Sequence, residues 1–278
     1  MEFSCHSWAF TDQPVTEALG TIARLGFRYA DLGTGPHLNL LDAVSASKRV
    51  QLFQEIRTAL KIFNLQLADL YLFLPRIAYA AEKKRQTDIT LFKGLLPFAK
   101  GLRTPGITVS PGLIQPDADE GAWQRCIAAL REMQSAAQEA GIALSIEPHL
   151  DSMAATPSKA LQLLEEIKGL QLTLDWAHLH YQGIDLKSIT ELLPHTRHIQ
   201  IRQAKPGTLQ TPFEEGTIDL KQVISTLHQS GYSGIVSVET MQTIGWHGMR
   251  PVNSILESIR LRDVLREARD SQVPHQSP

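Results

Sequence analysis

Short apolar runs alternate with longer amphipathic segments along the chain, and this alternation restricts the possible folds more than any other feature. The apolar runs are too short for buried helices and are typical of strands buried on both faces. They cover residues 3–10, 29–32, 66–73, 107–110, 142–146, 170–174, 198–201 and 235–238. The segments predicted to be helices cover residues 12–25, 44–63, 78–102, 118–140, 157–169, 185–193, 218–230 and 252–269.

Strict alternation of strands and helices predicts parallel strands joined by helical crossovers. Eight such units in 278 residues predict the α/β class and a single closed (β/α)8 TIM barrel. An open doubly wound sheet is the alternative, but Gly33-Thr34-Gly35 is followed by Pro36 and no third glycine completes a dinucleotide-binding motif. We expect one catalytic barrel domain over residues 1–269 and a polar C-terminal tail over residues 270–278.

The charge balance bears on the class of partner. The chain has 27 Lys and Arg against 29 Asp and Glu, with a formal net charge of -2, which does not favour nucleic acid as a partner. No apolar run approaches the roughly 18 residues that span a membrane, and the first residues lack the pattern of a signal peptide. Cys5 and Cys126 are the two cysteines and do not form a disulfide framework. We therefore expect a cytoplasmic protein with a small-molecule substrate and no membrane partner.

Polar residues end four successive apolar runs in the second half of the chain. These runs deliver Glu147, Asp175, Gln200 or His198, and Glu239 to the C-terminal rim of the predicted barrel, where barrel enzymes place their sites. Buried carboxylates facing one another repel unless a cation offsets their charge. Carboxylate and amide oxygens suit Mg²⁺ or Mn²⁺, and such a site could also accept Co²⁺ or Zn²⁺.

The second half of the chain resembles the xylose isomerase-like TIM-barrel superfamily, which contains sugar isomerases, sugar epimerases and dehydroshikimate dehydratases. The motifs that carry the resemblance are Ile146-Glu147-Pro148-His149, Leu174-Asp175-Trp176-Ala177-His178, His198-Ile199-Gln200, Glu215-Gly216-Thr217-Ile218-Asp219 and Val238-Glu239. The resemblance implies that Glu147, Asp175 and Glu239 are metal ligands. The family's fourth ligand is most often a histidine; Gln200 stands there, as in the hydroxypyruvate isomerase branch, and His198 remains the alternative ligand.

The resemblance also implies an enzyme of carbohydrate metabolism. We expect a divalent-metal-dependent isomerase or epimerase that acts on a small hydroxy-carbonyl, sugar-like substrate. The metal would polarise the carbonyl, and Glu147 and Glu239 would move a proton between adjacent carbons through an enediolate. His178, three residues after Asp175, would face the substrate as a further catalytic residue.

Three alternatives remain. A metal-dependent dehydratase of a cyclic hydroxy-keto acid, similar to dehydroshikimate dehydratase, would use the same first proton abstraction. An endonuclease-IV-like nuclease would need more metal-binding histidines and a basic surface, and a non-catalytic barrel would not need the carboxylate set. Ketose 3-epimerases carry an acid six positions after the fifth-strand glutamate, whereas this chain has Met153 there.

Further substrate contacts are expected from His6 in the first strand, His37 in a loop, His149 beside Glu147, and Trp176 as a wall of the pocket. His149 is alternatively a residue that orients Glu147. For each of these side chains, packing in the barrel without any substrate contact is the competing interpretation.

Arg202 directly follows the seventh apolar run and, with Lys205, predicts a basic loop at the rim. Such a loop could bind a carboxylate or phosphate of the substrate, or it could be a solvated charge. A glycine-flanked segment at residues 244–248 could close over a ligand. Barrels of this family often pair, so a homo-oligomer is possible, with the last helix as a candidate contact.

Overall fold

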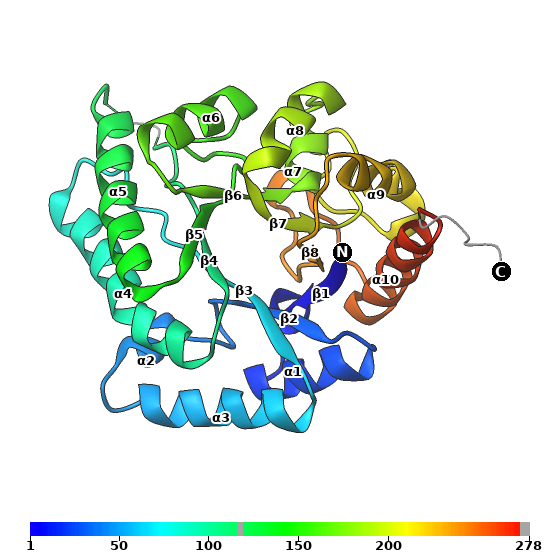
Figure 1. The fold of residues 1–278 in the computed structure, drawn as a ribbon, viewed down its shortest axis with the longest axis horizontal. Coiled ribbons are helices and arrows are strands. Elements are labelled where there is room, and N and C mark those ends of the chain that lie inside the picture. Colours follow the sequence, from blue (N-terminus) through cyan, green and yellow to red (C-terminus); the bar gives the residue numbers. More distant parts are fainter. Residues whose placement is uncertain (116–118, 273–278) are drawn as a thin grey trace.

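The chain forms a closed barrel of eight parallel strands surrounded by helices (Figure 1). The structure is a computed structural model and describes residues 1–115 and 119–272. Each strand pairs with its neighbours in sequence order, and β1 closes the barrel by pairing with β8, with Phe3 opposite Val236. The predicted single (β/α)8 barrel is confirmed.

The elements follow the predicted order. The strands are β1 (Glu2–His6), β2 (Tyr29–Gly33), β3 (Gln66–Leu72), β4 (Gly106–Val109), β5 (Ala143–Ile146), β6 (Gln171–Asp175), β7 (Thr196–Ile201) and β8 (Ile235–Val238). The α-helices are α1 (Val15–Arg24), α2 (Leu40–Val44), α3 (Arg49–Ile62), α4 (Glu82–Gly101), α5 (Ala122–Ala140), α6 (Pro157–Glu166), α7 (Trp176–Tyr181), α8 (Leu186–Leu192), α9 (Leu220–Gln229) and α10 (Ser254–Asp270). The 3₁₀-helices are η1 (Ser7–Phe10), η2 (Leu193–His195), η3 (Phe213–Glu215) and η4 (Trp246–Gly248).

Two differences from the predicted elements have local causes. The first apolar run does not stay extended to residue 10, because Nδ1 of His6 accepts a hydrogen bond from the backbone of Trp8 and starts η1. An additional helix, α7, follows β6 directly, because the carboxylate of Asp175 accepts the backbone N–H of Ala177 at 2.8 Å and caps the helix.

Other boundaries also shift. The helix predicted over residues 44–63 is α3 and begins at Arg49, and the short helix α2 precedes it. The helix predicted from residue 118 begins at Ala122, and residue 118 itself lies outside the described residues. The predicted tail starts within α10, which ends at Asp270, and residues 273–278 also lie outside the described part.

Polar side chains fill the barrel interior, whereas the aliphatic core lies between the strands and the helices. Arg197 of β7 donates to Asp69 of β3 at 2.5 Å, and His198 of β7 contacts Asp31 of β2 at 2.6 Å. Since β7 neighbours neither β2 nor β3, these contacts cross the interior. Gly106 makes room for the first of them, because a Cβ there would lie 2.5 Å from the Arg197 guanidinium carbon.

The outer helices pack by their apolar faces. Helix α10 buries Leu261 and Leu265, while Ile255 and Leu256 at its start are about half exposed. None of the helices in residues 1–115 and 119–272 combines the length and the apolar character needed to cross a bilayer. The homo-oligomer that uses this helix stays a prediction.

Candidate active site

A pocket of about 710 Å³ opens at the C-terminal ends of the strands. Its volume is in the range of small-molecule sites. The residues that line it include Trp8, Tyr71, Glu147, Asp175, Glu239 and Trp246. The pocket therefore lies at the end of the barrel where the strand-end acids were expected.

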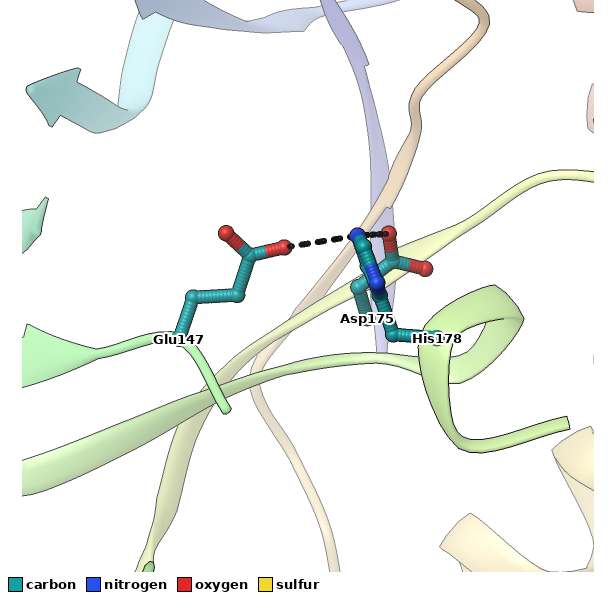
Figure 2. A group of neighbouring side chains, drawn as sticks. All are labelled: Glu147, Asp175 and His178. Atoms are coloured by element: carbon teal, nitrogen blue, oxygen red, sulfur yellow. Dashed lines mark ion pairs between the residues drawn. The ribbon is translucent and has the colours of Figure 1, made fainter. Parts of the chain in front are cut away.

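Glu147, Asp175 and His178 all line this pocket, and their side chains point toward one another (Figure 2). Glu147 follows β5, Asp175 ends β6, and His178 lies in the first turn of α7, which Asp175 caps. Nε2 of His178 lies 3.8 Å from Oε1 of Glu147 and 3.5 Å from Oδ2 of Asp175. The ligand atoms of all three residues lie within 4.8 Å of one another, and all three side chains are buried.

Glu239 reaches this group through Arg202. Nη1 of Arg202 donates to Oε2 of Glu239 at 2.7 Å and lies 2.8 Å from Oδ2 of Asp175. Arg202 is not a solvated loop charge, because its side chain is only 1% exposed, lies between carboxylates and contributes to the lining of the pocket. It directly follows β7, and the alternation of side chains along a strand puts it on the same side as His198 and Gln200. Nη2 has no hydrogen-bond partner among the described residues. Contact between Arg202 and the substrate stays a prediction.

Burial and like charges shift the titration of this group. Burial, together with the charge of Asp175, raises the pKa of Glu147 to about 8. Burial also raises the pKa of Glu239 well above its ordinary value, although the charge of Arg202 opposes the shift. The pKa of His178 is lowered well below its usual range by burial and by the charge of Arg202, so the ring is neutral at pH 7. A neutral imidazole is the form that binds a metal, and carboxyl groups with raised pKa values can hold a proton and transfer it near neutral pH.

Gln200 and His198, the two candidate ligands of β7, have different surroundings. His198 is occupied by Asp31, with 2.6 Å between Nε2 and Oδ2. Gln200 is fully buried and lies opposite Asp175 in the strand register. Neither amide atom of Gln200 has a hydrogen-bond partner among the described residues. These surroundings favour Gln200, and its role as a ligand stays a prediction.

Two of the expected substrate residues, Trp176 and His37, are not among the described residues that line the pocket. Trp176 is 4% exposed and packs in the hydrophobic core between barrel and helices. His37 is half-buried, and its Nε2 contacts the hydroxyl of Ser7 at 2.9 Å. Neither side chain contributes to the described lining of the pocket. Contact between the substrate and either residue stays a prediction.

The two other expected histidines lie at or below the pocket. His6 is buried and packs against Trp8 with tilted rings, 4.5 Å between the ring centres, and burial lowers its pKa to about 3. His149 lines the pocket. Its ring contacts Ser110 at 2.7 Å and the Leu150 carbonyl at 2.6 Å, so the expected orientation of Glu147 by His149 is not observed.

The loops after β5 and β8 meet at the pocket mouth. Trp246 lines the pocket and packs edge-on against His178, with 5.8 Å between the ring centres. His247 contacts Asp151 at 2.6 Å, and both residues have positive φ, at 45° and 63°. Lys205, which was expected with Arg202 in a basic loop, pairs with Glu215 at 3.4 Å and is not among the described residues that line the pocket. The segment at 244–248 therefore covers one side of the site.

Tyr71, and Asp31 as the partner of His198, are buried polar residues that were not predicted as site residues. Tyr71 is 2% exposed, and its hydroxyl donates a hydrogen bond to Oε2 of Glu147. A tyrosine near the end of a buried strand is a signal for such a role, because a buried hydroxyl needs a partner. The Asp31–His198 contact joins residues 167 positions apart and has no local signal.

The donor chemistry fits a divalent cation. Glu147, Asp175 and His178 each offer one ligand atom, and Gln200 and Glu239 provide further oxygens on neighbouring strands. Oδ2 of Asp175 accepts no hydrogen bond of good geometry within the described part of the chain, although Nη1 of Arg202 lies 2.8 Å from it. Mixed carboxylate and imidazole donors suit Mn²⁺, Co²⁺ or Zn²⁺, and an all-oxygen subset suits Mg²⁺.

Comparison with known proteins gives one family. The family profile described as xylose isomerase-like TIM barrel matches residues 19–266. An inosose isomerase of Halalkalibacterium halodurans is 27% identical over 164 residues, which cover 54% of this chain and 58% of that protein.

Solved structures show the same fold. A D-tagatose 3-epimerase-like protein superposes with a TM-score of 0.78 at 17% identity, covering 98% of this chain and 99% of the other. The 3-keto-D-glucoside 4-epimerase of E. coli gives a TM-score of 0.77 at 18% identity, covering 96% and 99%. A probable 3-DHS dehydratase of Bacillus anthracis gives 0.75 at 19% identity, also covering 96% and 99%.

Proposed function

The chain belongs to the xylose isomerase-like TIM-barrel family, and from this premise we propose that it is a divalent-metal-dependent isomerase or epimerase. The substrate class is a small, uncharged hydroxy-carbonyl compound of the sugar type, which places the enzyme in carbohydrate metabolism. The observation that carries the proposal is the convergence of Glu147, Asp175 and His178, with Glu239 beside them, in one pocket. The named relatives, an inosose isomerase and sugar epimerases, support the same reaction class.

The pocket favours an uncharged substrate. Among the described residues that line it, Arg202 carries the one permanent positive charge, and Asp175 and Glu239 already neutralise it. A phosphate or carboxylate would meet the side chains of Glu147 and Glu239, and no Lys or Arg among the described lining residues is free to pair with it. The free donor at Nη2 of Arg202 suits a hydroxyl or carbonyl oxygen of the substrate.

The residues divide the chemistry between them. Glu147, Asp175 and His178, with Gln200 and Glu239 as further candidates, would hold the ion. A bound divalent ion would polarise the carbonyl group of the substrate. Glu147 and Glu239 would remove a proton from the carbon beside the carbonyl and return it to the neighbouring carbon or face. Tyr71 holds Glu147 in place, and Trp8 and Trp246 provide apolar walls that exclude water.

Proton exchange tests the proposal. We would incubate the Mn²⁺-loaded chain in D₂O with inosose, with D-tagatose and with 3-dehydroshikimate, and follow products and deuterium incorporation by NMR. We expect deuterium at the carbon beside the carbonyl of a neutral substrate. The variant Glu239→Gln should lower this rate by about a hundredfold, since general acid–base groups contribute that much or more. Glu214→Gln, on an exposed residue paired with Arg260, is the matched control.

The outcome separates the candidate functions. Conversion of 3-dehydroshikimate with loss of water, and no exchange with the neutral ketoses, would replace the isomerase proposal by the dehydratase alternative. No exchange with any hydroxy-ketone, despite bound Mn²⁺, would reject the proposed reaction class.

A further inference from the structure

Arg202 places a positive charge at the donor set that the proposed metal would use. Its guanidinium is anchored at two nitrogens: Nε donates to the carbonyl oxygen of Leu209 at 3.3 Å, and Nη1 donates to Oε2 of Glu239 at 2.7 Å. The same Nη1 lies 2.8 Å from Oδ2 of Asp175. Two acids delivered by β6 and β8 therefore share one guanidinium nitrogen.

Asp175 Oδ2 is the oxygen that two cations would share. It belongs to the metal-binding group, 3.5 Å from Nε2 of His178, and it is also the oxygen closest to Arg202. An ion bound to this oxygen and a guanidinium at 2.8 Å from it would be near neighbours of like charge. Asp175 and Arg202 are each 1% exposed, so water screens their interactions little.

The charge balance gives Arg202 a role in the metal-free protein. Without a cation, the buried carboxylates of Glu147, Asp175 and Glu239 would repel one another. Arg202 offsets part of this repulsion and remains charged in the interior, because the neighbouring carboxylates raise its pKa.

We infer that Arg202 is a built-in counter-cation that competes with the divalent ion for Asp175 and Glu239, and so weakens metal binding by this chain. The inference rests on the proposed function, because it concerns the same metal site. One consequence concerns metal affinity: removal of the guanidinium should increase the affinity of the protein for the divalent ion. It should also destabilise the metal-free protein.

Mn²⁺ titration of purified protein tests the competition. The native chain, Arg202→Gln and Lys205→Gln would be compared by isothermal calorimetry and by the EPR signal of free Mn²⁺. Lys205→Gln removes one cation from the same loop, where Lys205 pairs with Glu215 rather than with the site. We expect Arg202→Gln to bind Mn²⁺ at least roughly tenfold more tightly than the native chain, since a nearby like charge is lost at low screening. Lys205→Gln should bind like the native chain.

Equal or weaker Mn²⁺ binding by Arg202→Gln overturns the inference. If this variant does not fold in metal-free buffer, thermal unfolding at increasing Mn²⁺ decides the question. Recovery of the folded state at Mn²⁺ concentrations too low to shift the Tm of the native chain supports the competition, and no recovery contradicts it. The proposed function is judged separately, by product formation in the native chain, so an active native enzyme with a weaker-binding variant rejects the competition alone.

Discussion

The hydroxyl of Tyr71 donates a hydrogen bond to Oε2 of Glu147, which connects the third strand of the barrel to the carboxylate that follows the fifth. Burial and the charge of Asp175 raise the pKa of Glu147, and this hydrogen bond opposes the shift by stabilising the ionised form. The other oxygen, Oε1, is the one nearest His178. Tyr71 thus holds one oxygen of Glu147 while leaving the second available in the pocket.

Tyr71→Phe should weaken Mn²⁺ binding and slow product formation, each by about tenfold. A hydrogen bond to a charged group contributes about 1.5–3 kcal/mol, and its loss leaves Glu147 harder to ionise and less well oriented. Calorimetric titration and initial rates measure the two effects. Tyr79→Phe is the control, since Tyr79 lies outside this pocket. Unchanged binding and rate in Tyr71→Phe would show that the hydroxyl has no functional role.

Asp31→Asn should destabilise the fold by about 3 kcal/mol, because it removes one partner of a buried pair and leaves His198 without its carboxylate. Burial raises the pKa of Asp31, but the charge and hydrogen bond of His198 outweigh burial and lower the pKa to about 2. The stabilisation is therefore complete above the ordinary pKa of a carboxyl group and is lost as the pH falls towards 2.

Urea unfolding as a function of pH measures this effect. The difference in free energy of unfolding between the native chain and Asp31→Asn should be constant near neutral pH and should shrink as the pH falls from about 4 to 2. Asp42→Asn, in an exposed pair with Lys48, should cost less than about 1 kcal/mol. A difference that grows on acidification would contradict the assignment.

Arg197→Met should destabilise the protein by roughly 3–5 kcal/mol while leaving the activity of the folded fraction intact. Arg197 donates to Asp69 at 2.5 Å and to Ser145 at 2.8 Å, and its loss leaves a buried carboxylate uncompensated. It contributes nothing to the described lining of the pocket, so substrate binding should not change. Arg131→Met, from an exposed pair with Glu166, is the control for thermal unfolding. A large rise in KM would place Arg197 in the site instead.

Trp246→Ala should raise KM about tenfold with little change in stability. The indole lines the pocket and packs against His178. Because Trp246 is 38% exposed, part of its apolar surface is open to contact with a substrate. Steady-state kinetics and Tm measure the two effects. Ile244→Ala, at a side chain 66% exposed in the same loop, should change neither. An unaltered KM would show that the substrate does not reach the indole.

Much of the fold could be predicted because its signals are local. Alternating apolar runs and amphipathic helices specify parallel strands with helical crossovers, and the barrel is the closed form of that pattern. The acids Glu147, Asp175 and Glu239 could be assigned to one rim for the same reason, since each ends an apolar run. Features that depend on a single side chain were missed, such as helix α7, which begins where the carboxylate of Asp175 caps it.

The environment of each acid could not be predicted from the sequence. Arg202 has the sequence context of a rim loop, yet barrel closure turns it inward between Asp175 and Glu239. His198 is two residues from Gln200, but only the fold brings Asp31, 167 positions away, to its ring.

The sequence by itself determined the barrel and the residue types at its C-terminal rim, because periodicity and strand-end polarity are properties of short segments. The tertiary structure decided which charges pair, which nitrogen of Arg202 is free and which wall Trp246 supplies. These depend on distances across the barrel interior, and electrostatic interactions there are set by separation and burial rather than by order along the chain.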